Sequence, residues 1–125
     1  MVKKHIVIIE MTSTGLSAYV QDLLGVVTTG ADLSEIKKNI TEALELFYED
    51  EPKKIQLSVT IRVDFKQFFR HYNFLNQKTL ASKIGMDNTL MSQYIRGIKT
   101  PSEKQLSRIS SGIKQVGREL AELHF

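Results

Sequence analysis

The sequence contains no cysteine, only 2 prolines and only 7 glycines in 125 residues. Without cysteine the chain has no disulfide framework, no thiolate zinc site, no iron–sulfur cluster and no cysteine nucleophile. A content of 42% hydrophobic and 25% charged residues excludes low-complexity and collagen-like sequences and is typical of a folded globular chain. This length suffices for one ordinary domain or two very small ones.

Long hydrophobic runs are also missing. The apolar run at residues 5–9 is too short for the core of a signal peptide and far too short to span a bilayer. No cysteine pattern indicates an oxidising compartment. We therefore expect a cytoplasmic protein that does not associate with a membrane.

Charge is distributed unevenly along the chain. Residues 1–60 hold 6 Lys and Arg against 9 Asp and Glu, a net charge of −3, whereas residues 61–125 hold 11 against 5, a net charge of +6. This asymmetry favours two tasks, with nucleic acid a candidate partner of the basic half and a basic protein a candidate partner of the acidic half. Two ordinary solvated surfaces are the alternative, which charge alone does not exclude.

The first half of the sequence predicts a small sheet with one helix. Apolar and β-branched residues predict strands at residues 4–11, 15–20 and 24–29. Residues 32–35, Asp-Leu-Ser-Glu, form a capping box that begins a helix. Residues 55–63 then alternate between apolar and polar, which is typical of a half-buried strand. The apolar stripe of the helix consists of Leu33, Ile36, Ile40, Ala43, Leu44 and Phe47.

The second half predicts helices only. Asp64, Asn76 and Asp87 are placed to cap three short helices. Residues 100–103, Thr-Pro-Ser-Glu, combine an N-cap, a proline at the first helical position and a capping-box glutamate, so a last helix is expected from there to about residue 123. The inward-facing residues of the three short helices are Phe65, Phe68, Phe69 and Tyr72, then Leu80, Ala81 and Ile84, then Met91, Tyr94 and Ile95.

Residues 77–97 form the motif with the most specific chemistry. Two short helices meet at Gly85, Ala81 is small where the helices approach each other, and Met91 and Tyr94 anchor the second helix. The remaining face of that helix carries amides, hydroxyls and a guanidinium, which are the groups that read bases in the major groove. These residues are Asn88, Thr89, Ser92, Gln93 and Arg96.

This motif resembles the helix-turn-helix of the phage-repressor (XRE, Cro-like) family, including the glutamine that opens the first helix and the residues 96–102 that follow the second. The resemblance covers about residues 63–109. It implies base-reading positions for Asn88, Thr89 and Gln93. It also implies positions at the phosphates or the groove edge for Gln77 and Ser92, and phosphate contacts for Lys78, Arg96 and Lys99. A helical hairpin that makes only protein contacts is the alternative.

The order of the segments in the first half resembles that of the HicB antitoxin family. The segments that carry this resemblance are residues 5–10, 15–20, 22–30 and 33–47. The N-terminal domain of that family is a small sheet with a helix, similar to a partial RNase H fold, and a helix-turn-helix follows it in many members. The resemblance implies an α+β fold class, with a small antiparallel sheet and one helix in residues 1–61 and an all-α helix-turn-helix domain in residues 62–125. It also implies toxin contacts at Asp22, Leu23 and Leu24.

The RNase H resemblance raises the question of nuclease activity, which requires carboxylates that converge on metal ions. Only Glu10 and Asp22 lie at strand ends where convergence is plausible. His5, His71 and His124 are scattered without metal-ligand spacing and are interpreted as surface or edge histidines. The Walker, GxGxxG, GxSxG and HExxH motifs are absent. We therefore expect no enzyme, no cofactor and no metal site.

The last helix carries a second apolar pattern. Its residues at three-four spacing are Leu106, Ile109, Ile113, Val116, Leu120 and Leu123. The first two are expected to pack in the helix-turn-helix domain. Beyond Gly112, where we expect a kink, no partner is obvious within so small a domain, which favours Val116, Leu120 and Leu123 as a dimer contact. Packing against the strand domain or against neighbouring helices is the alternative.

Together, the two resemblances imply a type II antitoxin. On this hypothesis we expect the acidic half to bind and block a basic, mRNA-cleaving HicA toxin, and the basic half to bind the double-stranded operator DNA of the shared operon as a dimer or higher oligomer. The alternatives are a free-standing XRE-type regulator whose N-terminal domain senses a ligand or oligomerises, and a metal-dependent nuclease. A neighbouring gene for a small basic protein separates the first two hypotheses, and cleavage that a chelator abolishes identifies the third.

Overall fold

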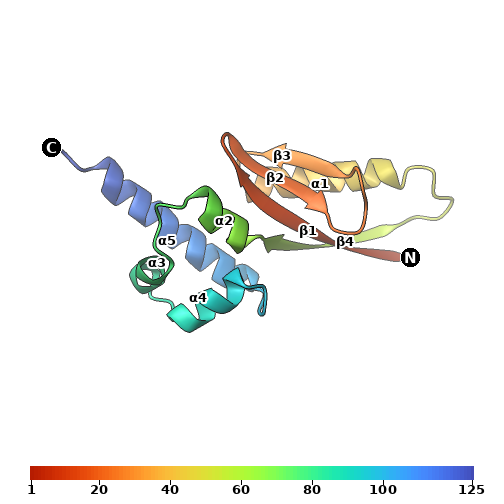
Figure 1. Ribbon diagram of the computed structural model, residues 1–125. Helices are drawn as coiled ribbons and strands as arrows, with labels where there is room; N and C mark the ends of the chain where they lie inside the picture. The colour runs from red at the N-terminus through yellow and green to blue at the C-terminus, as the bar shows by residue number, and fades with distance from the viewer. The chain divides into compact units, whose positions relative to one another are not determined.

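The computed structural model describes residues 1–125 and shows an α+β protein with a four-stranded sheet and five helices. The chain divides into two compact units, Met1–His71 and Tyr72–Phe125, which we call the first and second units. The elements along the chain are β1 (Val2–Thr12), β2 (Gly15–Val20), β3 (Val27–Gly30), α1 (Leu33–Phe47), β4 (Gln56–Val63), α2 (Phe65–His71), α3 (Gln77–Ile84), α4 (Asn88–Ile95) and α5 (Glu103–Ala121) (Figure 1).

The sheet of the first unit has the strand order β3-β2-β1-β4. β1, β2 and β3 form an antiparallel meander, in which Ile9 lies opposite Ala18 and Ala18 opposite Thr28. β4 pairs with β1 in the parallel direction, with His5 opposite Val59. The expectation of an antiparallel sheet is therefore confirmed for β1, β2 and β3 and wrong for β4. β4 is parallel to β1 because α1 carries the chain back to the end of the sheet where β1 begins.

The core of the first unit lies between the sheet and α1. Alternate strand residues face α1, because side chains of a strand alternate between the two faces of a sheet. The N-cap Asp32 accepts the backbone N–H of Glu35 at 2.9 Å, as the capping box predicts. The buried residues of this core are Val7, Ile9, Ala18, Val20, Val26, Ile36, Ile40 and Leu44.

Two local features of the first unit differ from expectation. β3 begins at Val27 rather than at residue 24, because the N–H groups of Leu23 and Val26 bond to the carbonyls of Val20 and Leu23 at 3.3 and 3.4 Å and close a turn instead. α1 ends at Phe47 with that side chain exposed, and the aromatic ring that is half-buried belongs to Tyr48, the C-cap.

α2 belongs to the first unit. The carboxylate of Asp64 accepts the backbone N–H of Gln67 at 3.0 Å and caps the helix. The Gln67 amide then accepts the N–H of Met11 at 2.8 Å and donates to the Met11 carbonyl at 2.9 Å, so its side chain continues the hydrogen bonding of β1. Because of these bonds the division of the chain falls after His71 and not, as expected, after residue 61.

The second unit contains α3, α4 and α5. Asn76 and Asp87 cap α3 and α4 by accepting the N–H groups of Thr79 and Thr89, both at 2.9 Å, as predicted. The start of α5 differs from the prediction. Its N-cap is Ser102, whose hydroxyl accepts the N–H of Gln105 at 3.2 Å, and not Thr100.

α5 is one continuous helix through Gly112, where a kink was expected. The glycine instead allows α5 and α3 to approach closely, because a Cβ at this position would lie 2.3 Å from Cγ1 of Ile84. On either side of this contact, Arg108 donates to the carbonyl of Gly85, and Lys83 forms an ion pair with Glu119 at 2.7 Å. Three contacts along α5 thus hold it against α3 and the turn that follows α3.

Candidate nucleic-acid interface

α3 and α4 are joined by a tight turn at Gly85. This glycine has φ of +82°, a left-handed conformation that is costly for residues with a Cβ. The N–H of Met86 bonds to the carbonyl of Ala81 at 2.8 Å, and the Met86 side chain is buried. Two short helices joined by a glycine turn are the geometry that the sequence motif predicts. The burial of Met86 after the turn was not predicted.

The exposed face of α4 is polar along its whole length. Since an α-helix advances 100° per residue, the predicted DNA-contacting positions from residue 88 to residue 96 lie in one arc of about 140°. Asn88, Thr89 and Arg96 are exposed, and Ser92 and Gln93 are half-buried. The opposite arc holds Leu90, Met91, Tyr94 and Ile95, of which Met91 and Tyr94 are buried. The structure therefore brings the predicted side chains of α4 together on one surface.

The residues after α4 form a second tight turn. The carbonyl of Gln93 accepts the N–H groups of Ile98 and Lys99 at 2.9 and 3.3 Å. Gly97 has φ of +75°, so the chain turns sharply at the end of α4. Lys99 is exposed immediately beyond this turn.

Gln77 and Lys78 are the first two residues of α3, and Gln77 is half-buried while Lys78 is exposed. Backbone N–H groups in the first turn of a helix have no carbonyl partner within that helix, and they favour anions such as phosphate. This position suits the phosphate or groove-edge contacts that the resemblance implies for both residues.

The charge of the second unit favours a polyanion. It holds 8 Lys and Arg against 4 Asp and Glu, a net charge of +4. Lys78, Arg96 and Lys99 are exposed and form no ion pair, whereas Lys83 is paired with Glu119. The carboxylate of Asp87 lies beside Asn88 and Thr89 and is engaged in capping α4.

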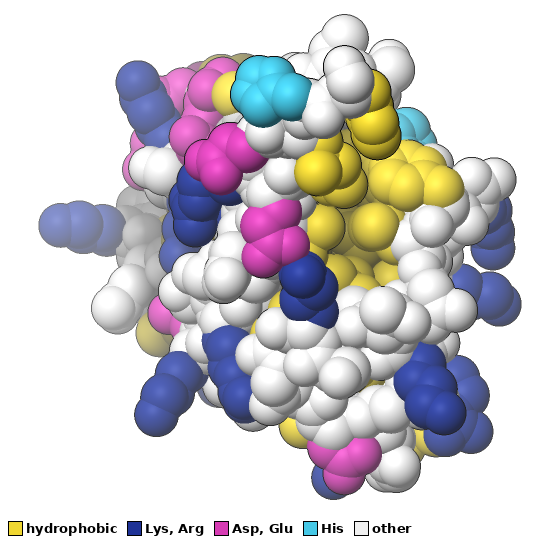
Figure 2. Space-filling view, turned by 90° about the vertical axis from the view of Figure 1, so that its left-hand side faces the viewer, with side chains coloured by type: hydrophobic (Ala, Val, Ile, Leu, Met, Phe, Trp, Pro, Cys, Tyr) yellow, Lys and Arg dark blue, Asp and Glu magenta, His cyan; other side chains and the backbone are white.

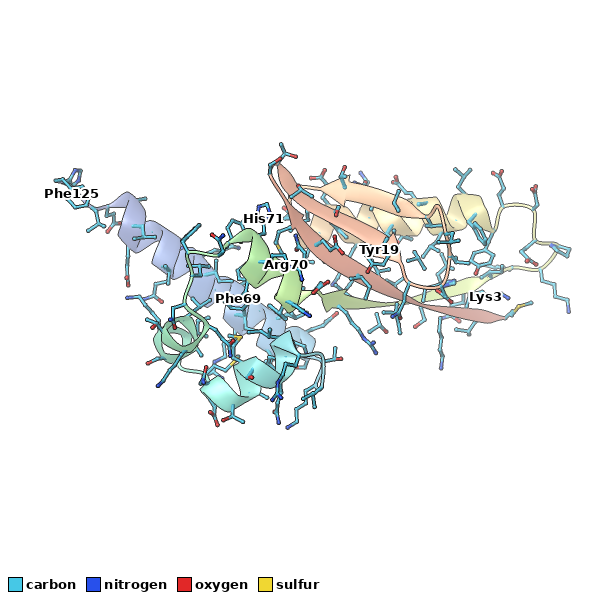
Figure 3. All side chains as sticks on the ribbon, in the orientation of Figure 1. Lys3, Tyr19, Phe69, Arg70, His71 and Phe125 are labelled. Atoms are coloured by element: carbon cyan, nitrogen blue, oxygen red, sulfur yellow. The ribbon has the colours of Figure 1, made fainter.

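The end of α5 carries exposed apolar side chains. Val116 is half-buried, and Leu120 and Leu123 are exposed, as is Phe125 beyond the helix (Figure 3). Figure 2 views the side on which α5 ends and shows exposed hydrophobic side chains with both acidic and basic side chains beside them. The dimer contact at Val116, Leu120 and Leu123 stays a prediction.

The predicted toxin contacts lie in the turn between β2 and β3. Asp22 and Leu24 are exposed. Leu23 is half-buried and packs against the core of the first unit, so its side chain anchors the turn to that core.

His5 was expected at the surface or at an edge, and it is buried, with 6% exposure. Its Nδ1 lies 3.2 Å from the Asp22 carboxylate and its Nε2 lies 2.8 Å from the Tyr48 hydroxyl. A neutral ring satisfies both contacts when Nδ1–H donates to Asp22 and Nε2 accepts from Tyr48. Burial, followed by the charges of Asp22 and Glu51, raises the pKa of Tyr48 and keeps its hydroxyl protonated for this bond.

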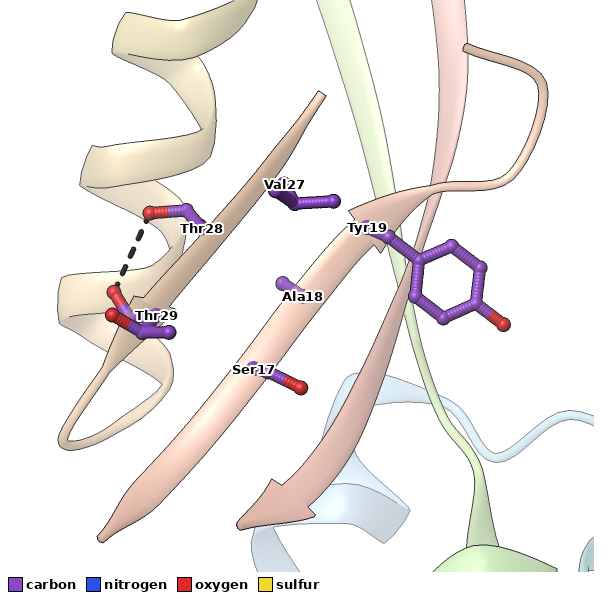
Figure 4. Close-up of a pocket in the computed structure, with 6 residues that line it drawn as sticks. All are labelled: Ser17, Ala18, Tyr19, Val27, Thr28 and Thr29. Atoms are coloured by element: carbon purple, nitrogen blue, oxygen red, sulfur yellow. Dashed lines mark hydrogen bonds between the residues drawn. The ribbon is translucent and has the colours of Figure 1, made fainter. Parts of the chain in front are cut away.

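The sheet face opposite α1 carries a second exposed apolar group. The strand register aligns Ile8, Tyr19 and Val27 in one row across three strands. Figure 4 shows the ring of Tyr19 pointing away from α1. Burial, followed by the charges of Glu10 and Asp64, raises the pKa of Tyr19, so both carboxylates lie near this row.

Glu10 and Asp22 do not converge. Asp22 lies beside His5, and Glu10 follows five residues later on β1, a distance of about 17 Å along an extended strand. No group of three or more His, Asp or Glu side chains is placed to hold a metal ion.

None of the helices combines the length and the apolar character that crossing a membrane requires. No protein-family model, no curated protein and no solved structure matches the chain.

Proposed function

We propose that this chain is an antitoxin of the HicAB type, with the first unit binding and blocking a basic, RNA-cleaving toxin and the second unit binding the operator of the shared operon. Blocking is steric and electrostatic, since the chain itself performs no chemical step in this proposal.

The polar arc of α4 is the observation that carries the proposal. Its amides can pair with adenine in a bidentate way, its hydroxyls can reach several bases, and its guanidinium suits guanine or phosphate. The arc lies on a helix anchored by Met91 and Tyr94 and preceded by a glycine turn. A face used only for protein contacts would be expected to contain large apolar or aromatic side chains near its centre.

The first unit supports the other half of the proposal. Its three strands and one helix occur in the same order as the segments that carry the HicB resemblance, residues 5–10, 15–20, 22–30 and 33–47. Its net charge is −1, since it holds 9 Lys and Arg against 10 Asp and Glu. The acidic character is therefore local, with 5 acidic and no basic residues in residues 42–51.

Co-expression with the product of the adjacent gene tests this function. The full chain should restore growth when that gene is induced, should purify together with its product, and should shift the DNA upstream of its own gene in a gel. A chain that shifts this DNA but neither binds the product nor restores growth is a free-standing regulator, and the antitoxin proposal then fails.

A further inference from the structure

Two segments that are distant in the sequence meet at one end of the first unit. His5 bonds to Asp22 in the β2–β3 turn and to Tyr48 at the C-terminus of α1. Figure 1 shows the turn and the end of α1 at the same end of the sheet, where β1 begins. The histidine therefore joins the two segments into one surface.

Exposed apolar side chains lie in both of these segments. Leu24 is 102% exposed, so no part of the fold covers it. Phe47, in the last turn of α1, is 51% exposed. Leu46 is also exposed, but it lies two residues after the fully buried Leu44 and therefore faces away from the sheet. The Phe47 ring packs edge-on against Tyr48 with ring centroids 5.0 Å apart, which places it next to the His5 contact. Large apolar side chains grouped in this way mark interaction sites on soluble proteins.

The turn that presents Leu24 is anchored on both sides. Leu23 packs against the core and Val26 is buried, and the N–H of Val20 bonds to the carbonyl of Val26 at 3.1 Å. The His5–Asp22 contact adds a side-chain tie at 3.2 Å. Because these contacts hold Leu24 in place before binding, a partner does not have to order the turn, and less entropy is lost on association.

Carboxylates lie in the same two segments. Glu49, Asp50 and Glu51 follow the last turn of α1, and the Asp22 side chain is 63% exposed. Lys53 and Lys54 follow in the chain, and Lys3 lies over the Tyr48 ring with Nζ 5.8 Å from the centroid (Figure 3). With Glu42 and Glu45 on α1 the acidic side chains are twice as many as the basic ones, 6 against 3, which favours a basic partner.

The row of Ile8, Tyr19 and Val27 on the sheet face opposite α1 has charged side chains of both signs near it. Arg62 lies beside Ile8 in the same row, and Glu10 and Asp64 lie near Tyr19. A row with charges of both signs gives a basic protein no clear electrostatic preference.

We propose that Asp22, Leu24, Phe47, Glu49, Asp50 and Glu51 form the toxin-binding surface of the first unit, with Leu24 and Phe47 entering apolar depressions on a basic protein. This inference rests on the proposed function, because the basic protein is the toxin. His5 and Tyr48 act as positioning residues beneath the surface.

The test compares Leu24→Asp with Val27→Asp in the full chain, using the purified product of the adjacent gene as the probe. Both substitutions place the same charge at an exposed aliphatic residue, 102% exposed at Leu24 and 64% at Val27. Leu24→Asp should weaken binding about tenfold or more, whereas Val27→Asp should change it about twofold at most. Unchanged circular dichroism will show that both variants are folded.

A second comparison tests the charge. Glu49→Gln with Asp50→Asn should slow association about three- to tenfold at low salt and less at high salt. Glu10→Gln with Glu35→Gln removes the same number of charges elsewhere on the unit and should leave the rate unchanged.

The outcomes separate this inference from the proposed function. If Val27→Asp weakens binding and Leu24→Asp does not, the toxin binds the sheet face opposite α1 and the inference is overturned, while the antitoxin function stands. If the unsubstituted chain does not bind the probe at all, the proposed function fails and this surface assignment fails with it.

Discussion

Asn88 and Gln93 are expected to set the sequence preference of DNA binding, because their amides lie on the exposed arc of α4. Replacing either by Ala should cost about 1 to 3 kcal/mol against the operator and little against random DNA. Lys78→Ala should instead weaken binding to both DNAs alike and reduce its dependence on salt, since a phosphate contact releases counterions regardless of sequence. Titrations of each variant against both DNAs at several salt concentrations measure these differences.

An unchanged ratio of operator to random binding for Gln93→Ala would mean that α4 is not the reading helix. Lys78→Ala serves as the matched control, because it removes an exposed side chain from the other helix of the motif.

Residues of α4 were predictable from the sequence, and the role of His5 was not. The polar arc depends on helical periodicity, which is a local property of residues 88–96. The two partners of His5 lie 17 and 43 positions away in the sequence, so only the folded chain identifies them. The alternation of His5 with Val7 and Ile9 was the one available indication that this histidine faces the core.

The close contact between α3 and α5 depends on Gly112. Gly112→Ala should destabilise the second unit, because the added Cβ overlaps Ile84 and overpacking of this kind costs about 1 to 3 kcal/mol. The gain of about 1 kcal/mol from replacing a helical glycine by alanine offsets only part of this cost. Denaturant unfolding of the full chain, followed by helical circular dichroism, measures the change.

Gly117→Ala is the matched control on the same helix. Nothing lies within 4 Å of a Cβ at that position, so this variant should be more stable by up to about 1 kcal/mol. Equal stabilisation by both substitutions would show that α3 and α5 do not approach closely at Gly112.

The starts of three helices were predictable from the sequence. Asp32, Asn76 and Asp87 each cap the helix that the sequence assigns to them. At α5 both Thr100 and Ser102 have a side chain that can cap, and the proline between them is compatible with either start. In the structure Pro101 is buried ahead of the helix, so tertiary packing selects Ser102.

If the second unit binds an operator as proposed, the chain is expected to act as a dimer, because a single small module buries little surface on DNA. Val116→Asp with Leu120→Asp should give a lower mass in sedimentation with unchanged circular dichroism. Ser107→Asp with Ser111→Asp places the same charges on the opposite side of α5 and should leave the mass unchanged. Equal masses for both double variants would exclude this part of α5 as the dimer contact.

The direction in which β4 pairs with β1 could not be predicted from the sequence. The alternation of apolar and polar residues in residues 55–63 predicts a strand with one buried face. This alternation does not distinguish a parallel neighbouring strand from an antiparallel one. The direction of β4 depends on the end of the sheet at which α1 ends. The division of the chain into two units after His71 follows from the hydrogen bonds between Gln67 and Met11. Both depend on contacts between segments that are far apart in the sequence.

Growth of cells in which the adjacent gene is induced tests the central claim, that toxin binding and DNA binding belong to different units of one chain. With the chain expressed from an independent promoter, the Asn88→Ala, Gln93→Ala double variant should restore growth as fully as the unsubstituted chain, although it no longer selects the operator. Failure of the unsubstituted chain to restore growth would contradict the antitoxin function, and failure of the double variant alone would contradict the assignment of toxin binding to the first unit.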